Sequence, residues 1–137
     1  MIKLLDECRE IRNEIKEIEE DIEEITLRVS APKSQSFDDM PKATSKLGNS
    51  IETYIEKKER LEEEKEELVQ QLESKWKNIV IALNLNNITI EEKLLLYYRF
   101  HEGYSWRHCG NKLKWNDNKV FRIYSKIRKS LENNGVN

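Results

Sequence analysis

A run of apolar side chains near the start of the chain recurs at alternating spacings of four and three residues. This spacing places them along one stripe of an α-helix. Most residues between them are charged, as on the solvent-facing side of a long helix. The run predicts one long amphipathic helix, whose stripe consists of Leu4, Cys8, Ile11, Ile15, Ile18, Ile22, Ile25 and Val29.

The segment 30–44 separates this helix from a second one. It holds both prolines of the chain, Pro32 and Pro41, and proline ends a helix because it lacks a backbone N–H. The same alternation then resumes and predicts a helix over residues 45–83. Three lysines interrupt this second stripe, where their long stems can cover apolar surface. The stripe consists of Leu47, Ile51, Tyr54, Lys58, Leu61, Lys65, Leu68, Leu72, Lys75, Ile79 and Ala82.

Together the two helices predict an all-α fold. We expect a long N-terminal antiparallel hairpin, or coiled coil, over residues 1–83 and a C-terminal domain over residues 84–137. A charged fraction of 36% with only four glycines is typical of long, solvent-exposed helices. A linker of about 15 residues is long for a turn between neighbouring helices. Pairing within one chain and pairing between two chains therefore both stay open, as does a docking surface along the stripes.

Local capping signals divide the C-terminal domain into short helices. Thr89 and Glu92 form a capping-box pattern that starts a helix, and Gly103 predicts its end. Ser105 and Asn116 are candidates for the N-caps of two further helices.

The last two of these helices are separated by a very short turn at Lys114 and Trp115. This spacing is typical of a helix-turn-helix, in which the second helix enters the major groove of DNA. The apolar positions of the second helix predict its inward stripe, which consists of Val120, Ile123, Tyr124, Ile127 and Leu131.

The net charge of -2 conceals an uneven distribution. Residues 1–29 hold ten acidic and five basic side chains, whereas residues 84–137 hold five acidic and ten basic ones. Within residues 105–131, Asp117 is the only acidic residue and stands against eight basic ones. A local basic excess attracts phosphate even where the whole protein is acidic, so double-stranded DNA is the expected partner.

With the apolar stripe facing inward, side chains near the start of the last helix face outward and are the candidate readers of base edges. Arg can fork onto guanine, Asn can pair with adenine, Asp can accept from cytosine, and an aromatic ring can contact a thymine methyl group. The candidate readers are Asp117, Asn118, Phe121 and Arg122. The candidates for phosphate contact are Ser105, Arg107, Lys119, Lys126 and Lys129. Two alternatives stay open, in which Asp117 only complements the helix dipole and Phe121 belongs to the core.

One stretch of the C-terminal domain resembles region 4 of sigma-70-type factors. It consists of residues 99–106, with the sequence RFHEGYSW, followed by Gly110, Leu113, Val120, Ile123 and Leu131. The chain is more similar still to small phage transcription regulators of the ArpU and RinA kind, which join an N-terminal helical segment to such a helix-turn-helix. The resemblance covers residues 89–131 and reaches the hairpin only loosely.

The resemblance implies a phage or prophage regulator, and its promoter-contacting positions fall on the same four candidate readers. The sequence departs from the family pattern in the turn, where Lys114 stands at a position that is commonly glycine. Arg107 and His108 replace residues that are usually acidic, and Phe121 replaces a polar reader. No sequence preference is therefore carried over.

Catalysis is not expected, because the chain has no nucleophile with a recognisable base and no Gly-rich phosphate loop. The soft metal ligands are Cys8, His101, His108 and Cys109, and their spacing predicts neither a metal site nor a cofactor. No apolar run approaches the roughly 20 residues that span a bilayer. We expect a protein of the bacterial host cytoplasm without membrane contact.

The leading hypothesis is a sequence-specific DNA-binding transcription regulator whose hairpin dimerises the protein or contacts RNA polymerase. The alternative is a protein-interaction module that binds a host or phage protein through the hairpin and the sigma-like fold, with DNA contact incidental. Salt dependence separates the two, because phosphate contacts weaken with salt and an apolar interface changes little.

Overall fold

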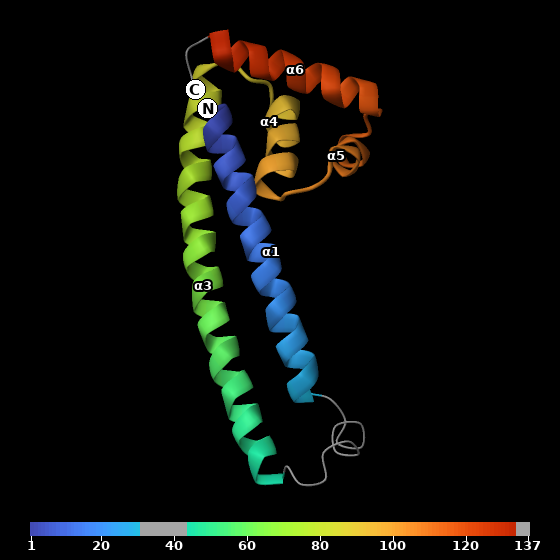
Figure 1. The fold of residues 1–137 in the computed structure, drawn as a ribbon. Coiled ribbons are helices and arrows are strands. Elements are labelled where there is room, and N and C mark those ends of the chain that lie inside the picture. Colours follow the sequence, from blue (N-terminus) through green and yellow to red (C-terminus); the bar gives the residue numbers. More distant parts are fainter. Residues whose placement is uncertain (31–43, 134–137) are drawn as a thin grey trace. The chain divides into compact units, whose positions relative to one another are not determined.

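The computed structural model describes residues 1–30 and 44–133, with the side chains of residues 30, 44–51 and 133 excepted. Most of the expected linker 30–44 therefore lies outside the described residues. The described chain forms helices and no strand, so the all-α expectation is confirmed. In chain order the elements are α1 (Ile2–Ser30), α3 (Thr44–Leu85), α4 (Ile90–Leu96), the π-helical segment η1 (Tyr97–His101), α5 (Trp106–Leu113) and α6 (Asp117–Asn133) (Figure 1).

The chain divides into two compact units. Unit 1 consists of Met1–Glu14 and Leu68–Asn137, and unit 2 consists of Ile15–Glu67. Both long helices, α1 and α3, contribute to each unit. The sequence predicts a domain boundary after residue 83. In the structure, however, the start of α1 and the end of α3 belong to the same compact unit as the short C-terminal helices.

In unit 1, the start of α1 packs antiparallel against the end of α3. Leu5, Cys8 and Ile11 are buried on α1, and Leu72, Ile79 and Leu83 are buried on α3. An ion pair of 3.1 Å joins the Glu7 carboxylate to the Lys75 ammonium group. The expected stripes are confirmed where their side chains are described, with one shift: the first buried leucine is Leu5, and Leu4 is only half-buried. Leu47 and Ile51 of the second stripe lie outside the described side chains.

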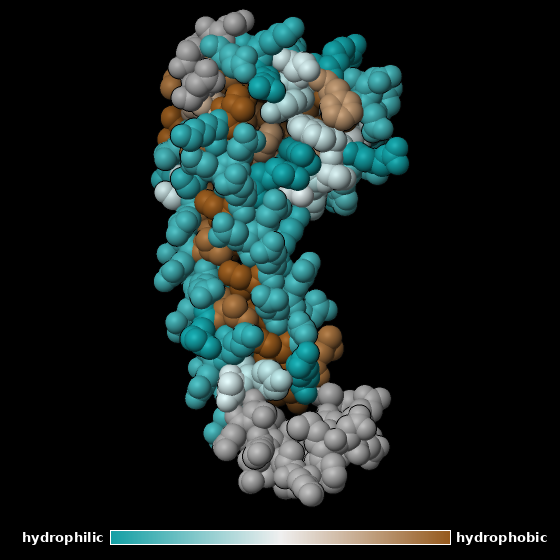
Figure 2. Space-filling view, viewed as in Figure 1, coloured by the Kyte–Doolittle hydropathy of each residue, from teal (hydrophilic) through white to brown (hydrophobic). Residues whose placement is uncertain are grey.

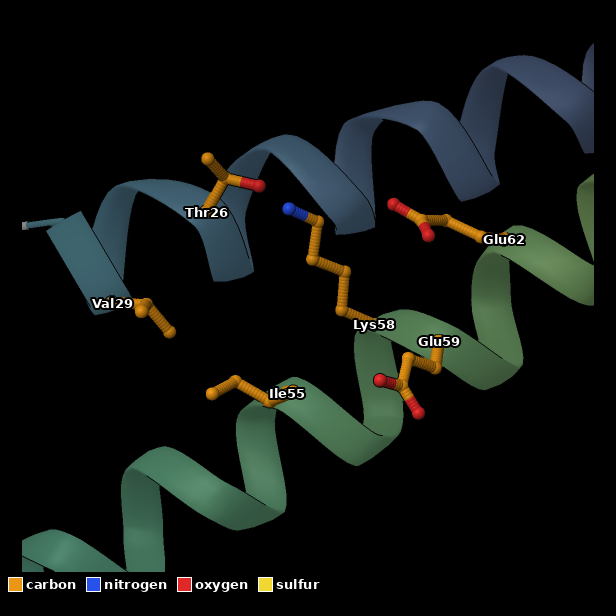
Figure 3. Close-up of a pocket in the computed structure, with 6 residues that line it drawn as sticks. All are labelled: Thr26, Val29, Ile55, Lys58, Glu59 and Glu62. Carbon is orange, nitrogen blue, oxygen red and sulfur yellow. The ribbon is translucent and has the colours of Figure 1, made fainter.

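In unit 2, the same two helices continue the antiparallel pairing within one chain. Ile15 and Ile25 are buried on α1, and the Arg28 guanidinium donates to the Tyr54 hydroxyl of α3 at 3.3 Å. Lys58 takes a stripe position on α3 and is half-buried. Figure 3 shows its stem extending from α3 towards α1. This arrangement lets the alkyl stem cover apolar surface while the ammonium group stays near water.

The short helices of unit 1 begin and end as the local signals predict. The Thr89 hydroxyl accepts from the Glu92 N–H at 3.2 Å, and the Glu92 carboxylate accepts from the Thr89 N–H at 3.0 Å, which completes the capping box. Gly103 has a φ of 73°, the left-handed conformation typical of a helix end. The core of this region consists of Leu95, Leu96, Phe100, Cys109, Val120, Ile127 and Leu131.

The π-helical segment η1 is held by the two long helices. The buried His101 ring faces two carboxylates, with its Nε2 at 2.8 Å from Glu73 Oε1 and its Nδ1 at 3.2 Å from Glu102 Oε2. Arg12 of α1 donates from Nε to the His101 carbonyl at 2.7 Å. An extra residue in a helical turn leaves backbone carbonyls to be satisfied from outside, and Arg12 does so here. Residues of the hairpin therefore position the C-terminal helices.

Candidate nucleic-acid interface

The candidate interface begins at α5, whose start is fixed by Ser105. Its backbone is extended, with φ of -63° and ψ of 158°, and its hydroxyl accepts from the His108 N–H at 3.1 Å. This bond satisfies one of the unpaired N–H groups at a helix start. The expected cap is confirmed, and it leaves Ser105 exposed at the helix N-terminus.

A tight turn joins α5 to α6. Lys114 takes the left-handed conformation, with φ of 61° and ψ of 39°, and the Trp115 N–H donates to the Gly110 carbonyl at 2.9 Å. Gly110 has no room for a side chain, because a Cβ there would lie 2.8 Å from the Trp115 carbonyl oxygen and 3.1 Å from Val120 Cγ2. Glycine at this position lets the turn and α6 approach α5 closely.

The start of α6 is fixed by Asn116, whose side-chain oxygen accepts from the Lys119 N–H at 2.8 Å. This confirms the third expected cap. Val120, Ile127 and Leu131 are fully buried, and Ile123 and Tyr124 are half-buried. The inward stripe is therefore confirmed, which fixes the face that α6 presents to solvent.

All four candidate base readers lie exposed within the first two turns of α6: Asp117, Asn118, Phe121 and Arg122. Asn118 and Arg122, one turn apart, point most directly away from the inward stripe because α-helical residues advance about 100° each. A shallow hollow beside them is lined by Asn116, Asn118, Lys119 and Arg122.

An ion pair joins two of the candidate site residues, Arg107 and Asp117. Arg107 was expected at a phosphate and Asp117 at a base, and the structure places their charged groups 3.6 Å apart across the turn. The two side chains are 80% and 54% exposed, so solvent screens the pair and its contribution to stability is small. The pair leaves open whether Asp117 contacts a base, and Asp117 also lies in the first turn of α6, where a carboxylate complements the helix dipole.

The remaining phosphate candidates divide by position. Lys126 and Lys129 are exposed on the later turns of α6. Lys119 is half-buried, because its ammonium group lies 4.8 Å from the centre of the Trp115 ring. A cation over an aromatic face is attracted by the ring quadrupole, so Trp115 holds Lys119 at the rim of the hollow.

An aromatic cluster supports the other edge of the reading face. Phe121 is 50% exposed, and its ring centre lies 5.9 Å from that of Trp106. Trp106 in turn contacts Tyr124 at 4.7 Å and carries the Arg99 guanidinium 4.4 Å from its ring centre. Phe121 is therefore neither a full core residue nor a free side chain, since it is half exposed and its ring packs beside Trp106.

One residue of the outward face was missed by the sequence reasoning. Ser125 is exposed and lies seven residues after Asn118 and three after Arg122, a spacing that keeps all three on one helix face. Lys129 continues the same line. The helical spacing of these residues in the sequence is enough to identify Ser125 as part of the outward face. The outward ridge of α6 therefore consists of Asn118, Arg122, Ser125 and Lys129.

Both cysteines are shielded from reaction. Burial raises the pKa of the Cys8 thiol to about 11, and it also raises the pKa of Cys109. Among residues 1–30 and 44–133, no three His, Cys, Asp or Glu side chains are grouped so as to hold a metal ion. None of the helices in this part of the chain combines the length and apolar character needed to cross a bilayer.

No family model, curated protein or solved structure matches the chain.

Proposed function

We propose that the chain is a sequence-specific DNA-binding transcription regulator of phage or prophage type, acting in the cytoplasm of a bacterial host. In this proposal α5 and α6 form a helix-turn-helix, and α6 is the recognition helix that enters the major groove. One observation carries the proposal: an outward ridge with Asn118 and Arg122 stands at the capped start of α6, within a segment of eight basic residues and one acidic one.

The division of labour follows from the chemistry of each group. The Arg122 guanidinium fits guanine O6 and N7 in the major groove, and the Asn118 amide fits adenine N6 and N7. Arg107, Lys119, Lys126 and Lys129 contact phosphates, as does the helix N-terminus capped by Ser105. Phosphate contacts supply affinity without sequence information, whereas the two outward side chains supply discrimination.

The hairpin has the opposite charge and a separate role in this proposal. The described parts of unit 2, residues 15–29 and 52–67, hold fourteen acidic and six basic residues, so DNA is repelled there. In this proposal the hairpin contacts RNA polymerase or a second copy of the chain. The resemblance to phage regulators supports the same division between a helical arm and a DNA-reading end.

The test is selection of bound sequences from a pool of random DNA duplexes at moderate salt, with wild type, Arg122→Ala and Arg128→Ala in parallel. Arg128 is the matched control, because it lies on α6 but pairs with Glu132 at 3.1 Å away from the outward ridge. We expect an enriched motif that loses one base position only in Arg122→Ala, at a cost of about 1 to 3 kcal/mol for that base pair. Equal motifs in all three proteins would remove Arg122 from the readers.

A second function, a protein-interaction module with incidental DNA contact, is favoured by the exposed apolar side chains of unit 2. Leu27 is 64% and Ile55 is 43% exposed, and they do not complete the core. An apolar protein interface changes little with salt, whereas DNA binding through about six phosphates weakens roughly a thousandfold between 50 and 200 mM salt. The affinity of the protein for its partner, measured across this range of salt, therefore distinguishes the two functions.

A further inference from the structure

One apolar side chain interrupts the polar surface of the C-terminal helices. Phe121 is 50% exposed, and no other large hydrophobic side chain between residues 95 and 132 is exposed. It lies in the segment 105–131, which holds eight basic residues and one acidic one. Figure 2 shows mostly hydrophilic side chains over α5 and α6, around a small apolar area. The surface that carries Asn118 and Arg122 therefore offers one aromatic ring beside an amide and a guanidinium group.

The Phe121 ring is supported from beneath by a second ring, that of Trp106, whose centre lies 5.9 Å away. Trp106 is itself fixed on both sides. The buried Phe100 meets it edge to face at 6.2 Å, and the Arg99 guanidinium lies 4.4 Å from its ring centre. Arg99 also donates to the Tyr104 carbonyl at 3.0 Å. A side chain that is already held in place loses little freedom when a ligand covers it.

The position of Phe121 on α6 places it beside the two outward readers. It lies three residues after Asn118 and directly before Arg122. Residues three apart are neighbours on a helix surface, with Cβ atoms about 5 to 6 Å from each other. Successive bases of one DNA strand are about 3.4 Å apart along the helix axis. A base that Phe121 contacts therefore lies within about two base pairs of the one that Arg122 contacts.

The chemistry of the ring defines what it can recognise. A phenyl ring has no hydrogen-bond donor or acceptor comparable to an amide or a guanidinium group, so it cannot read the polar groups of a base edge. The methyl group at C5 of thymine is the apolar group that the major groove displays. Uracil and cytosine carry only hydrogen at C5, whereas 5-methylcytosine carries the same methyl group as thymine. The ring therefore distinguishes pyrimidines by this methyl group.

We infer that Phe121 is a third reader, and that it recognises the C5 methyl group of a pyrimidine, either thymine or 5-methylcytosine. The inference rests on the proposed function and extends it from two polar readers to a defined class of base. Trp106 holds the Phe121 ring at this place, and the methyl group covers its exposed part.

The experiment measures the affinity of wild type for the selected DNA duplex and for copies in which each thymine in turn is replaced by uracil. This replacement removes one methyl group and keeps every hydrogen-bonding group of the base pair. Close to the base pair read by Arg122, we expect one thymine whose replacement weakens binding about three- to tenfold, as for one buried methyl group. Phe121→Ala should bind both duplexes equally. Leu27→Ala truncates an exposed side chain of unit 2, so as the matched control it should keep the wild-type ratio.

A second comparison separates the methyl group from the rest of the base. The same base pair is replaced by a cytosine–guanine pair, with and without a methyl group at C5 of the cytosine. Wild type should bind the methylated duplex more tightly by a similar factor, and Phe121→Ala should not distinguish the two. Circular dichroism verifies that each variant is folded.

The outcomes separate the inference from the proposed function. Equal wild-type affinity for thymine and uracil at every position overturns the inference, as does a methyl effect of the same size in Phe121→Ala. In both cases a selected motif still supports the proposed function, so the inference alone fails. If selection enriches no motif, the proposed function fails and the inference fails with it.

Discussion

The hairpin of unit 2 and the C-terminal helices of unit 1 are stabilised in different ways. In unit 2 the helices share a repeated apolar stripe, half-buried lysines and exposed ion pairs such as Arg28 with Glu24 at 3.0 Å. In unit 1 individual residues have particular partners. Gly110 packs against the Trp115 carbonyl, and the His101 ring lies between two carboxylates. The Asn116 side chain accepts a hydrogen bond from the Lys119 N–H. A repeated stripe spreads stability over many similar contacts, whereas the C-terminal helices depend on single residues.

The largest expected difference is between two leucine truncations. Leu96→Ala in α4 removes a fully buried side chain and should cost about 2 to 5 kcal/mol of unfolding free energy. Leu61→Ala in unit 2 removes a half-buried one and should cost less than about 1.5 kcal/mol. All three tryptophans, Trp76, Trp106 and Trp115, lie in unit 1, so urea unfolding followed by fluorescence reports that unit. Circular dichroism reports both units, and equal costs would remove the contrast.

The next effect is an added methyl group at Gly110. Gly110→Ala should destabilise unit 1 by about 1 to 3 kcal/mol, because the new Cβ would press on backbone that cannot easily move. The neighbouring Asn111→Ala is the control, because Asn111 is exposed on the same helix and alanine favours helix. If tryptophan fluorescence reports the same midpoint for Gly110→Ala and wild type, α5 and the turn are not closely packed.

A smaller effect is expected at high pH. Burial raises the pKa values of Cys8, Cys109 and Tyr124 in the folded protein, so the folded state keeps these protons longer than the unfolded state. The resulting stability is present below about pH 9 and is lost as pH rises towards 11, by about 1 to 2 kcal/mol for Cys8. All three groups belong to unit 1. Urea midpoints between pH 8 and 11 should fall for wild type and fall less steeply for Cys8→Ala, and parallel curves would contradict the assignment.

The smallest effect is expected in the turn. Lys114 has a left-handed backbone, which is strained for a residue with a side chain, so Lys114→Gly should be neutral or stabilising by up to about 1 kcal/mol. Lys112→Gly removes the same charge inside α5 and should instead cost about 1 kcal/mol. A marked loss of stability in Lys114→Gly would show that the lysine side chain supports the turn.

The sequence predicted the features of the fold that depend on neighbours along the chain. Thr89, Ser105 and Asn116 are caps because each needs only the three residues that follow it. The packing of Arg12 and Glu73 around His101 was not predicted, because it joins residues far apart in the sequence. The π-helical segment was missed for the same reason, since its last carbonyl, that of His101, accepts from Arg12 of another helix.

The candidate site was predicted as far as helix geometry reaches. The inward position of Val120 and Ile127 fixes which residues face outward, and the same rule adds Ser125. The pairing of Arg107 with Asp117 and the contact of Lys119 with Trp115 depend on the shape of the turn, which spacing alone does not specify.

The proposed function requires that DNA contacts the outward face of α6 and avoids the acidic hairpin. The most direct measurement follows the backbone amide resonances of the full chain by NMR as a short mixed-sequence DNA duplex is added at moderate salt. We expect shifts concentrated in residues 105–131, with the resonances of residues 15–29 and 52–67 unchanged. Shifts centred on the hairpin, or none in α6, would contradict it.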